Sequence, residues 1–338
     1  MKIISMISGM GGAGKSINTF HLGHILSEMG KRVLMIDADP QCSLTYNCID
    51  KDSYERMCIE EKEYSNNKTK DNLNEEDTRP CKTLYYIMKN AVDGLEPPNN
   101  NVMPFNVKNK LDIIPGSMLM ERLNYSYDTS VHCEEARLRV SKHDEEEILR
   151  VTKSIRSVAE DNGKSYDYVL IDTSITSSEL TRMALLISDN FHVSINLNRL
   201  SFMNLISLDK RLKNIESDCL DSKSEFPSFL GYSVIHTRNK IEEYVELYED
   251  FRTFEKENSS NIIFANSDML LGNDIYNKLD ERLITISSIH RCPVWDITDI
   301  MLKGNIDKLD KISEKKNEFK KYYISFAEEL VRRLENKE

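Results

Sequence analysis

Apolar residues are concentrated in short runs that alternate with stretches of helical periodicity. The short runs predict buried strands at 2–8, 31–37, 110–116, 166–173, 190–195, 228–235 and 282–286. The helical spacings predict helices at 16–29, 82–88, 143–161, 177–187, 202–216, 240–256 and 305–336. Because strands alternate with helices, we expect an α/β fold, in which a mostly parallel, twisted sheet carries helices on both faces.

Two regions stand outside this alternation. Residues 49–80 are rich in charged and amide side chains and have little apolar periodicity, which predicts a solvated, partly mobile polar insertion. The segment 305–336 carries one apolar face and is predicted to be a final helix that packs on the rest of the domain. No internal repeat divides the chain, so we expect residues 1–338 to form one domain with this insertion and this terminal helix.

The first predicted strand leads into the segment Gly9-Met10-Gly11-Gly12-Ala13-Gly14-Lys15-Ser16, which fits the pattern G-x-x-x-x-G-K-[ST]. A strand before the glycines and a helix after them are the context that this pattern requires. Glycines let backbone N–H groups turn toward a phosphate, and the start of the helix adds a partial positive charge. Lys15 would reach the β and γ phosphates, and the Ser16 hydroxyl would complete the shell of a Mg²⁺ ion.

Two later strands end in carboxylates. The second strand runs into Asp37-Ala38-Asp39-Pro40-Gln41, and the strand 166–173 carries Asp172 near its end. Open α/β sheets bind their ligands at the carboxyl ends of the strands, so these side chains are expected beside the glycine loop. An apolar strand that ends in Asp is typical of a Walker B element, whose carboxylate holds Mg²⁺ through water.

The amino-acid composition bears on which partners the protein is expected to bind and in which cellular compartment it is expected to work. The formal net charge of −11 lowers the expectation of binding to nucleic acid or an anionic membrane, although a local basic patch would still allow it. The seven cysteines are scattered without a C-x-x-C pair, which argues against a zinc or iron–sulfur framework and fits a reducing cytosol. The chain starts directly in a strand and has no run of about 18 apolar residues, so we expect a soluble cytoplasmic protein without a signal peptide.

Taken in order, three segments resemble the ParA/MinD group of deviant-Walker P-loop ATPases: Gly9–Ser16, Asp37–Gln41 and Tyr166–Thr173. Leu111-Asp112-Ile113-Ile114-Pro115 also resembles the family's strand of the form LDLIP, and Asp39-Pro40-Gln41 resembles the ParA branch. The resemblance implies a P-loop NTPase fold of the SIMIBI type, ATP and Mg²⁺ as ligands, and a homodimer that closes around two ATP molecules.

The resemblance also implies roles for individual residues. Lys15 and Asp39 would be catalytic, with Asp39 orienting the attacking water, and the metal would be supported by Ser16, Asp37 and Asp172. Thr237 and Arg238 fall where the family lines the adenine pocket. The full set expected to bind the nucleotide is Gly9, Met10, Gly11, Gly12, Ala13, Gly14, Lys15, Ser16, Ile17, Thr237 and Arg238.

Three departures from the family pattern bear on activity. Met10 stands where the family has its signature lysine, which reaches the partner's phosphates in the dimer. Methionine supplies no charge there, so hydrolysis is expected to be weak and to depend on a partner. Ile17 replaces a hydroxyl residue, and Thr173-Ser174-Ile175 replaces the usual prolines. A branch of the family that positions carboxysomes also lacks the signature lysine.

Two basic clusters are candidate interaction surfaces. Lys210, Arg211 and Lys213 lie on the helix where ParA-like proteins have a basic edge that binds DNA without sequence preference, although a solvated helix face is an equal alternative. The lysines of the terminal helix are diluted by glutamates, which favours solvated pairing. The acidic end of that helix is poor for an anionic surface, so no membrane partner is expected.

The predicted function is therefore an ATP-dependent dimerising ATPase that positions or segregates DNA or another large cargo. It would bind nonspecific DNA, respond to a cargo-adaptor protein, and be cytoplasmic or nucleoid-associated. The alternative is an ATP-gated protein-recruiting switch with little or no hydrolysis, which the loss of the signature lysine motivates. A metabolic enzyme that phosphorylates a small molecule is a third alternative, against which Asp39-Pro40-Gln41 speaks.

Overall fold

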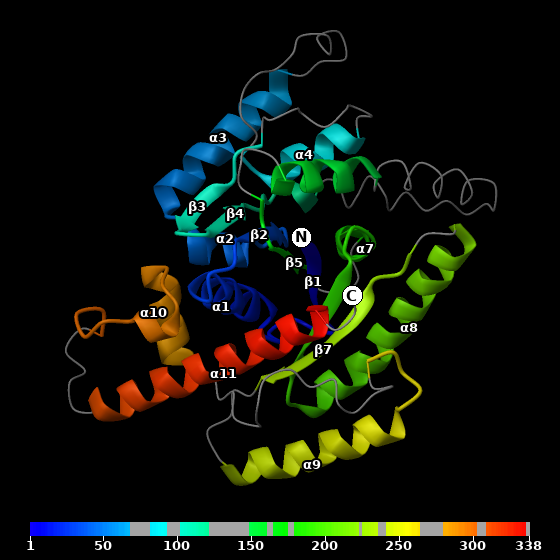
Figure 1. Ribbon diagram of the computed structural model, residues 1–338, viewed down its shortest axis with the longest axis vertical. Helices are drawn as coiled ribbons and strands as arrows, with labels where there is room; N and C mark the ends of the chain where they lie inside the picture. Colours follow the sequence, from blue (N-terminus) through cyan, green and yellow to red (C-terminus); the bar gives the residue numbers. More distant parts are fainter. Residues whose placement is uncertain are drawn as a thin grey trace.

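A central sheet of seven strands organises the protein (Figure 1). The computed structural model describes residues 1–67, 82–92, 102–121, 149–160, 165–174, 179–222, 225–235, 241–263, 280–302 and 309–335. The strand order is β3-β4-β2-β5-β1-β6-β7, and every neighbouring pair is parallel except β3 with β4. The mostly parallel α/β architecture expected from the sequence is confirmed.

The predicted strands are confirmed except for 282–286, and a short antiparallel strand, β3, was not foreseen. The strands are β1 Lys2–Ser8, β2 Val33–Ala38, β3 Phe105–Lys108, β4 Leu111–Ile114, β5 Tyr168–Thr173, β6 Asn190–Asn196 and β7 Ser228–Ile235. The labelled helices are α1 Lys15–Glu28, α2 Ser43–Cys48, α3 Lys51–Asn67, α4 Leu84–Val92, α7 Glu179–Leu186, α8 Arg199–Ser222, α9 Ile241–Glu257, α10 Glu281–His290, η3 Val294–Asp296 and α11 Leu309–Glu335. Residues 149–160, within the helix predicted at 143–161, are also helical.

The parallel strands are apolar on both faces because helices cover both. Along β2, Val33 and Met35 point to the face covered by α1, α10 and α11, whereas Leu34 and Ile36 point to the face covered by α4, α7 and the helix at 149–160. This alternation follows from the two-residue period of a strand. Helices α8 and α9 close a third cluster over β6 and β7.

The expectation of a strand at 282–286 is wrong, because this segment lies within α10. Asp280 caps the helix, and its side chain accepts hydrogen bonds from the backbone N–H groups of Arg282 and Leu283. Leu283 and Ser287, one helical turn apart, are the residues that α10 buries. An apolar run this short does not distinguish a strand from a helix by periodicity, and the cap decides for the helix.

The polar region 49–80 is more ordered at its start than its composition suggested. Its first part forms α3, and Tyr54 on that helix is buried. The Tyr54 hydroxyl donates to Cys42 Sγ at 3.3 Å, and its ring packs edge-on against Tyr46. The helix α3 therefore contacts the segment that follows Asp39, while residues 68–81 lie outside the described part of the chain.

Strand register places the two carboxylates at one edge of the sheet. Asp37 of β2 lies directly opposite Asp172 of β5, and β1, which leads into the glycine loop, pairs with β5 on its other side. Parallel pairing thus brings Asp37, Asp172 and the start of α1 to the same carboxyl edge. None of the described helices is both long and apolar enough to cross a membrane.

We expect Asp280→Ala to lower the free energy of unfolding by about 1 kcal/mol, because the cap of α10 is lost. Asp280→Asn retains a capping oxygen and removes only the charge that pairs with Lys315 of α11, so its cost should be smaller. Urea unfolding of the two variants measures the difference. Equal losses for both variants would mean that the ion pair, and not the cap, holds α10.

Candidate phosphate-binding site

The loop between β1 and α1 has the backbone shape that the glycine pattern predicts. Gly12 and Gly14 both have a φ of 74°, in the left-handed region that glycine adopts without strain. At Gly14 a Cβ atom would lie 2.1 Å from the Ile235 side chain at the end of β7. Gly14 also precedes the first turn of α1, where no side chain caps the helix. The N–H groups of that turn are therefore not taken by a side-chain cap, which suits an anion.

Helix α8 supports the first half of the loop. A Cβ atom on Gly9 would lie 3.2 Å from the backbone oxygen of Asn204, so loop and helix are in close contact. Ser8 Oγ donates to the Met10 carbonyl at 3.0 Å, and Asn196 Nδ2 donates to the Gly12 carbonyl at 3.3 Å. These contacts hold the loop from the carboxyl ends of β1 and β6 and from α8.

Lys15 and Asp172 meet at the base of the loop. Lys15 Nζ lies 3.6 Å from Asp172 Oδ1, and both side chains are buried. Thr19, one turn further along α1, donates from Oγ1 to the same oxygen at 3.4 Å. The other oxygen, Asp172 Oδ2, is buried without a hydrogen-bond partner. Such an orphaned carboxylate oxygen is costly unless a ligand or water meets it.

Burial raises the pKa of Asp172 above its ordinary value, and the Lys15 ammonium and a hydrogen bond from Ser16 oppose that rise. The Ser16 hydroxyl and the Asp172 carboxylate are oxygen ligands of the kind that a phosphate-bound Mg²⁺ uses, and the Lys15 ammonium beside them is a cation that suits phosphate oxygens. The described residues hold no group of three or more His, Cys, Asp or Glu side chains that would bind a metal alone. The residues fit a Mg²⁺ that shares its shell with phosphate oxygens and water.

Asp37 is engaged differently from Asp172. Its Oδ2 accepts from the Thr45 backbone N–H at 2.8 Å and from Thr45 Oγ1 at 2.7 Å, and its Oδ1 accepts from the Asp39 N–H at 3.1 Å. The backbone N–H of Gly116, just after the end of β4, donates to Thr45 Oγ1 at 2.9 Å. Thr45 therefore connects Asp37 with the chain that follows β4. Asp37 therefore anchors the segment that carries Asp39 and the start of α2.

Asp39 lies on that anchored segment. It is nearly buried, and its Oδ1 accepts from the Gln41 N–H at 2.9 Å. Cys42, which follows, has a φ of 55°, and the chain then enters α2. Thr237 and Arg238, expected at the adenine, lie outside the described residues.

The Met10 side chain contacts helix α8 of the same protein chain. Its Sδ accepts from Ser201 Oγ at 2.9 Å and faces Asn204 Nδ2 at 3.9 Å. Sequence reasoning identified the missing lysine but not this contact, because neither Ser201 nor Asn204 belongs to a motif. Thr45 was missed for the same reason, although a threonine eight residues after a strand-end aspartate is the only signal it offers.

The lysine and arginine side chains of the two basic clusters differ in their contacts. Lys213 is paired with Asp209 at 2.9 Å and donates to the Ser260 carbonyl at 3.2 Å, whereas Lys210 and Arg211 are exposed. On α11, three lysines hold the helix in place. Lys315 pairs with Asp280, Lys316 donates to the Ile297 carbonyl, and Lys320 pairs with Glu28 of α1.

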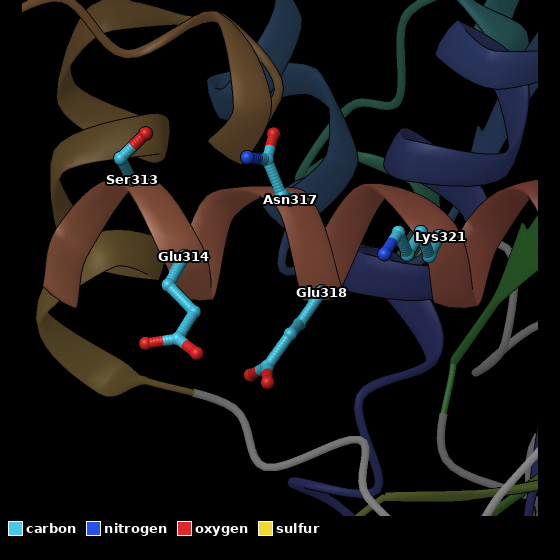
Figure 2. Close-up of a pocket in the computed structure, with 5 residues that line it drawn as sticks. All are labelled: Ser313, Glu314, Asn317, Glu318 and Lys321. Atoms are coloured by element: carbon cyan, nitrogen blue, oxygen red, sulfur yellow. The ribbon is translucent and has the colours of Figure 1, made fainter. Parts of the chain in front are cut away.

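One surface pocket lies along α11, away from the glycine loop (Figure 2). Figure 2 shows Glu314 and Glu318 on one side of the helix and Ser313 and Asn317 on the other, with Lys321 one turn on. All five lining residues come from one helix, and among the residues that the structure describes no second element lines the pocket. Polar groups that converge from several elements are what distinguishes a binding site, and the glycine loop has them.

Comparison with known proteins agrees with this geometry. The family model AAA_31, described as an AAA domain, matches residues 1–225. A ParA family protein of Chlamydia pneumoniae is 27% identical over 191 residues, which make up 56% of this chain and 56% of that protein. The chain thus spans about half the length of this curated relative.

Two solved structures share the fold. The pNOB8 ParA structure has a TM-score of 0.60 at 20% identity and covers 100% of this chain and 99% of its own. The ATP complex of Cyanothece McdA(D38A) has a TM-score of 0.59 at 16% identity and covers 98% of this chain and 96% of its own. At these identities the likeness establishes the fold alone.

Burial and the neighbouring Asp172 carboxylate raise the pKa of Asp37 to about 7. Between about pH 4 and pH 7 the folded protein keeps a proton that the unfolded chain releases, so this group lowers stability as pH rises through that window. Asp37→Asn removes the titration. The free energy of unfolding of the wild type minus that of Asp37→Asn is therefore expected to fall from pH 4 to 7 and then to level off.

Urea unfolding at several pH values measures this difference, with Asp50→Asn as a control of opposite sign. Hydrogen bonds from Ser53 lower the pKa of Asp50, so its stabilising effect is present above the unfolded pKa and is lost as pH falls. A difference for Asp37→Asn that does not change with pH would contradict the buried-carboxylate description.

Proposed function

The chain belongs to the AAA domain family and is a ParA-like P-loop ATPase, and on this premise we propose that it is an ATP-dependent dimerising ATPase that positions or segregates DNA or another large cargo. The observation that carries the proposal is the meeting of Lys15 with the orphaned Asp172 carboxylate beneath an uncapped helix start. A Mg²⁺–nucleotide supplies the positive ion and the phosphate oxygens that this arrangement can accept.

The proposed roles follow from the contacts. Backbone N–H groups of residues 9–17 would cradle the phosphates, with Lys15 at the β and γ positions. Ser16 and Asp172 would hold Mg²⁺, which neutralises phosphate charge. Asp39, fixed through Asp37 and Thr45, would orient the attacking water. Asp37 supports the metal indirectly, because its oxygens already accept three hydrogen bonds. Thr237 and Arg238 stay proposed adenine contacts.

Met10 decides how active the enzyme is expected to be. A cation that reaches the partner's phosphates supplies several powers of ten in rate in enzymes of this kind. Here that position holds a thioether that rests on Ser201 and Asn204 of its own chain. We therefore expect weak hydrolysis that a cargo-adaptor protein stimulates. The same observation favours a second candidate function, an ATP-gated switch that recruits a protein with little or no hydrolysis.

DNA is the proposed surface on which the protein acts. The pNOB8 ParA that shares this fold has been solved bound to nonspecific DNA, with a TM-score of 0.56 to this chain. Lys210 and Arg211 on α8 are exposed and available for phosphate contacts, whereas Lys213 is held by Asp209. A protein with this activity would work in the cytoplasm on the nucleoid. Because the formal net charge is −11, DNA binding would have to rely on a local basic patch such as this one.

Oligomeric state tests the nucleotide-gated dimer. We expect the wild type to be dimeric with ATP and monomeric with ADP or without nucleotide, and Lys15→Ala to stay monomeric throughout because it binds phosphate poorly. Light scattering on a sizing column measures this. Turnover of the wild type that Asp39→Ala abolishes would reject the non-catalytic switch. A wild type that never dimerises with ATP would reject the proposed function.

A DNA-binding measurement tests whether the exposed cations of α8, Lys210 and Arg211, contact DNA. With ATP, Lys210→Ala/Arg211→Ala is expected to weaken binding to nonspecific duplex DNA and to reduce the slope of log affinity against log salt by about 1 to 2. The matched control is Lys51→Ala/Arg56→Ala, which removes the same charge from the exposed face of α3. Equal losses in both variants would mean that net charge, and not the α8 patch, governs binding.

A further inference from the structure

Tyr323, on α11, contacts α1, the helix that begins at the phosphate loop, through its hydroxyl group. It donates to Asn18 Oδ1 at 2.8 Å, and Asn18 lies in the first turn of α1. Figure 1 shows α11 (red) running alongside α1 (blue). The two residues are 305 positions apart in the chain, so the contact joins its last described helix to its first.

Asn18 is at the centre of a buried four-residue junction. Its Nδ2 donates to Ser194 Oγ of β6 at 3.0 Å and to Ser233 Oγ of β7 at 2.9 Å. The side chains of Asn18, Ser194, Ser233 and Tyr323 are all at most 1% exposed. Both amide donors and the amide oxygen are therefore satisfied by named partners. Hydrogen bonds in so apolar a setting are directional, and they fix the amide with respect to three separate elements.

The junction lies directly behind the phosphate contacts. Asn18 is three residues after Lys15, and its backbone N–H donates to the Gly14 carbonyl at 2.8 Å. Thr19 Oγ1 donates to the Lys15 carbonyl at 3.0 Å and also reaches Asp172. The first turn of α1 thus carries Lys15 and Ser16 on its loop side and Asn18 on its sheet side. A shift of Asn18 moves the whole turn.

The next turn of α1 rests on the same tyrosine. The His21 ring stacks on the Tyr323 ring with centroids 5.1 Å apart. His21 Nδ1 lies 2.8 Å from the Ile17 carbonyl, and Nε2 accepts from the Val294 N–H at 3.3 Å. This pattern requires a neutral ring, and burial agrees with it by lowering the pKa of His21 to about 4. Tyr323 therefore holds α1 by its hydroxyl and by its ring at two successive turns.

We propose that Tyr323 is a positioning residue for the phosphate site: through Asn18 it fixes the first turn of α1, and it links the nucleotide state of the loop to the docking of α11. The proposal rests on the proposed function in one respect, because it requires nucleotide binding at the loop. Linkage is reciprocal, so a nucleotide that tightens the first turn of α1 must also stabilise α11 on it.

The variant Tyr323→Phe tests the hydroxyl and keeps the ring on His21. Tyr322→Phe is the matched control, since it removes a hydroxyl from the adjacent residue and leaves the bond between Tyr323 and Asn18 in place. Titration of the full chain with Mg²⁺ and a non-hydrolysable ATP analogue should give an affinity about three- to tenfold weaker for Tyr323→Phe. Tyr322→Phe should stay within about twofold of the wild type.

Hydrogen exchange supplies a readout that a purely structural role would not move. In the wild type, the analogue should slow amide exchange in α11 around residues 319–327, and Tyr323→Phe should lose much of this protection. The wild-type measurement stands even if the variant folds poorly, which thermal unfolding reports.

The outcomes separate this proposal from the proposed function. A wild type that does not bind the analogue overturns both. A wild type that binds it while α11 exchange is unchanged overturns the positioning role alone. The same holds if Tyr323→Phe, folded, binds with wild-type affinity, even where its melting temperature falls.

Discussion

The site depends on two carboxylates buried side by side at the carboxyl edge of the sheet. The register of β2 against β5 places Asp37 opposite Asp172, and two like charges so close in an apolar setting repel each other. The structure resolves this by giving the carboxylates different partners. Asp37 receives three hydrogen bonds from the segment that follows it, and Asp172 faces the Lys15 ammonium. As a result, Asp37 holds the backbone that follows it, whereas Asp172 keeps one oxygen without a hydrogen-bond partner at the proposed phosphate site.

Helices α2, α3 and α10 all contact the segment that follows Asp39. Thr45 is bound to Asp37, Tyr54 of α3 reaches Cys42, and Arg291 after α10 donates to the Ile49 carbonyl. These contacts all involve the chain between Asp37 and Ile49, which contains Asp39. A region that looked like a solvated insertion thus contributes its first helix to the surroundings of the proposed water-orienting residue. The site is held as much by these neighbours as by the glycine loop.

Sequence patterns predicted the features of the fold and the site that depend on the spacing of nearby residues. The glycine loop, the strands that end in Asp37 and Asp172, the parallel sheet and the ParA-like family all follow from short motifs in order. The contacts that fix side chains in three dimensions do not follow from such motifs. The choice between strand and helix at 282–286 was made by the Asp280 cap, and the bond between Tyr323 and Asn18 joins residues that no local pattern relates. Roles of individual residues stay predictions, because they depend on a ligand and a partner that sequence spacing does not describe.

The contact of Gly9 and Met10 with α8 has a thermodynamic consequence. Because α8 and β6 already support the loop from its own chain, the loop's conformational entropy is lost during folding and not during ligand capture. Preorganisation of this kind separates the shape of the loop from its charge. The contacts at Gly9 and Gly12 involve the backbone and not the side chain at position 10, so they do not require a charge there. In the proposed function, a change at position 10 would therefore alter the rate of hydrolysis more than the shape of the phosphate cradle.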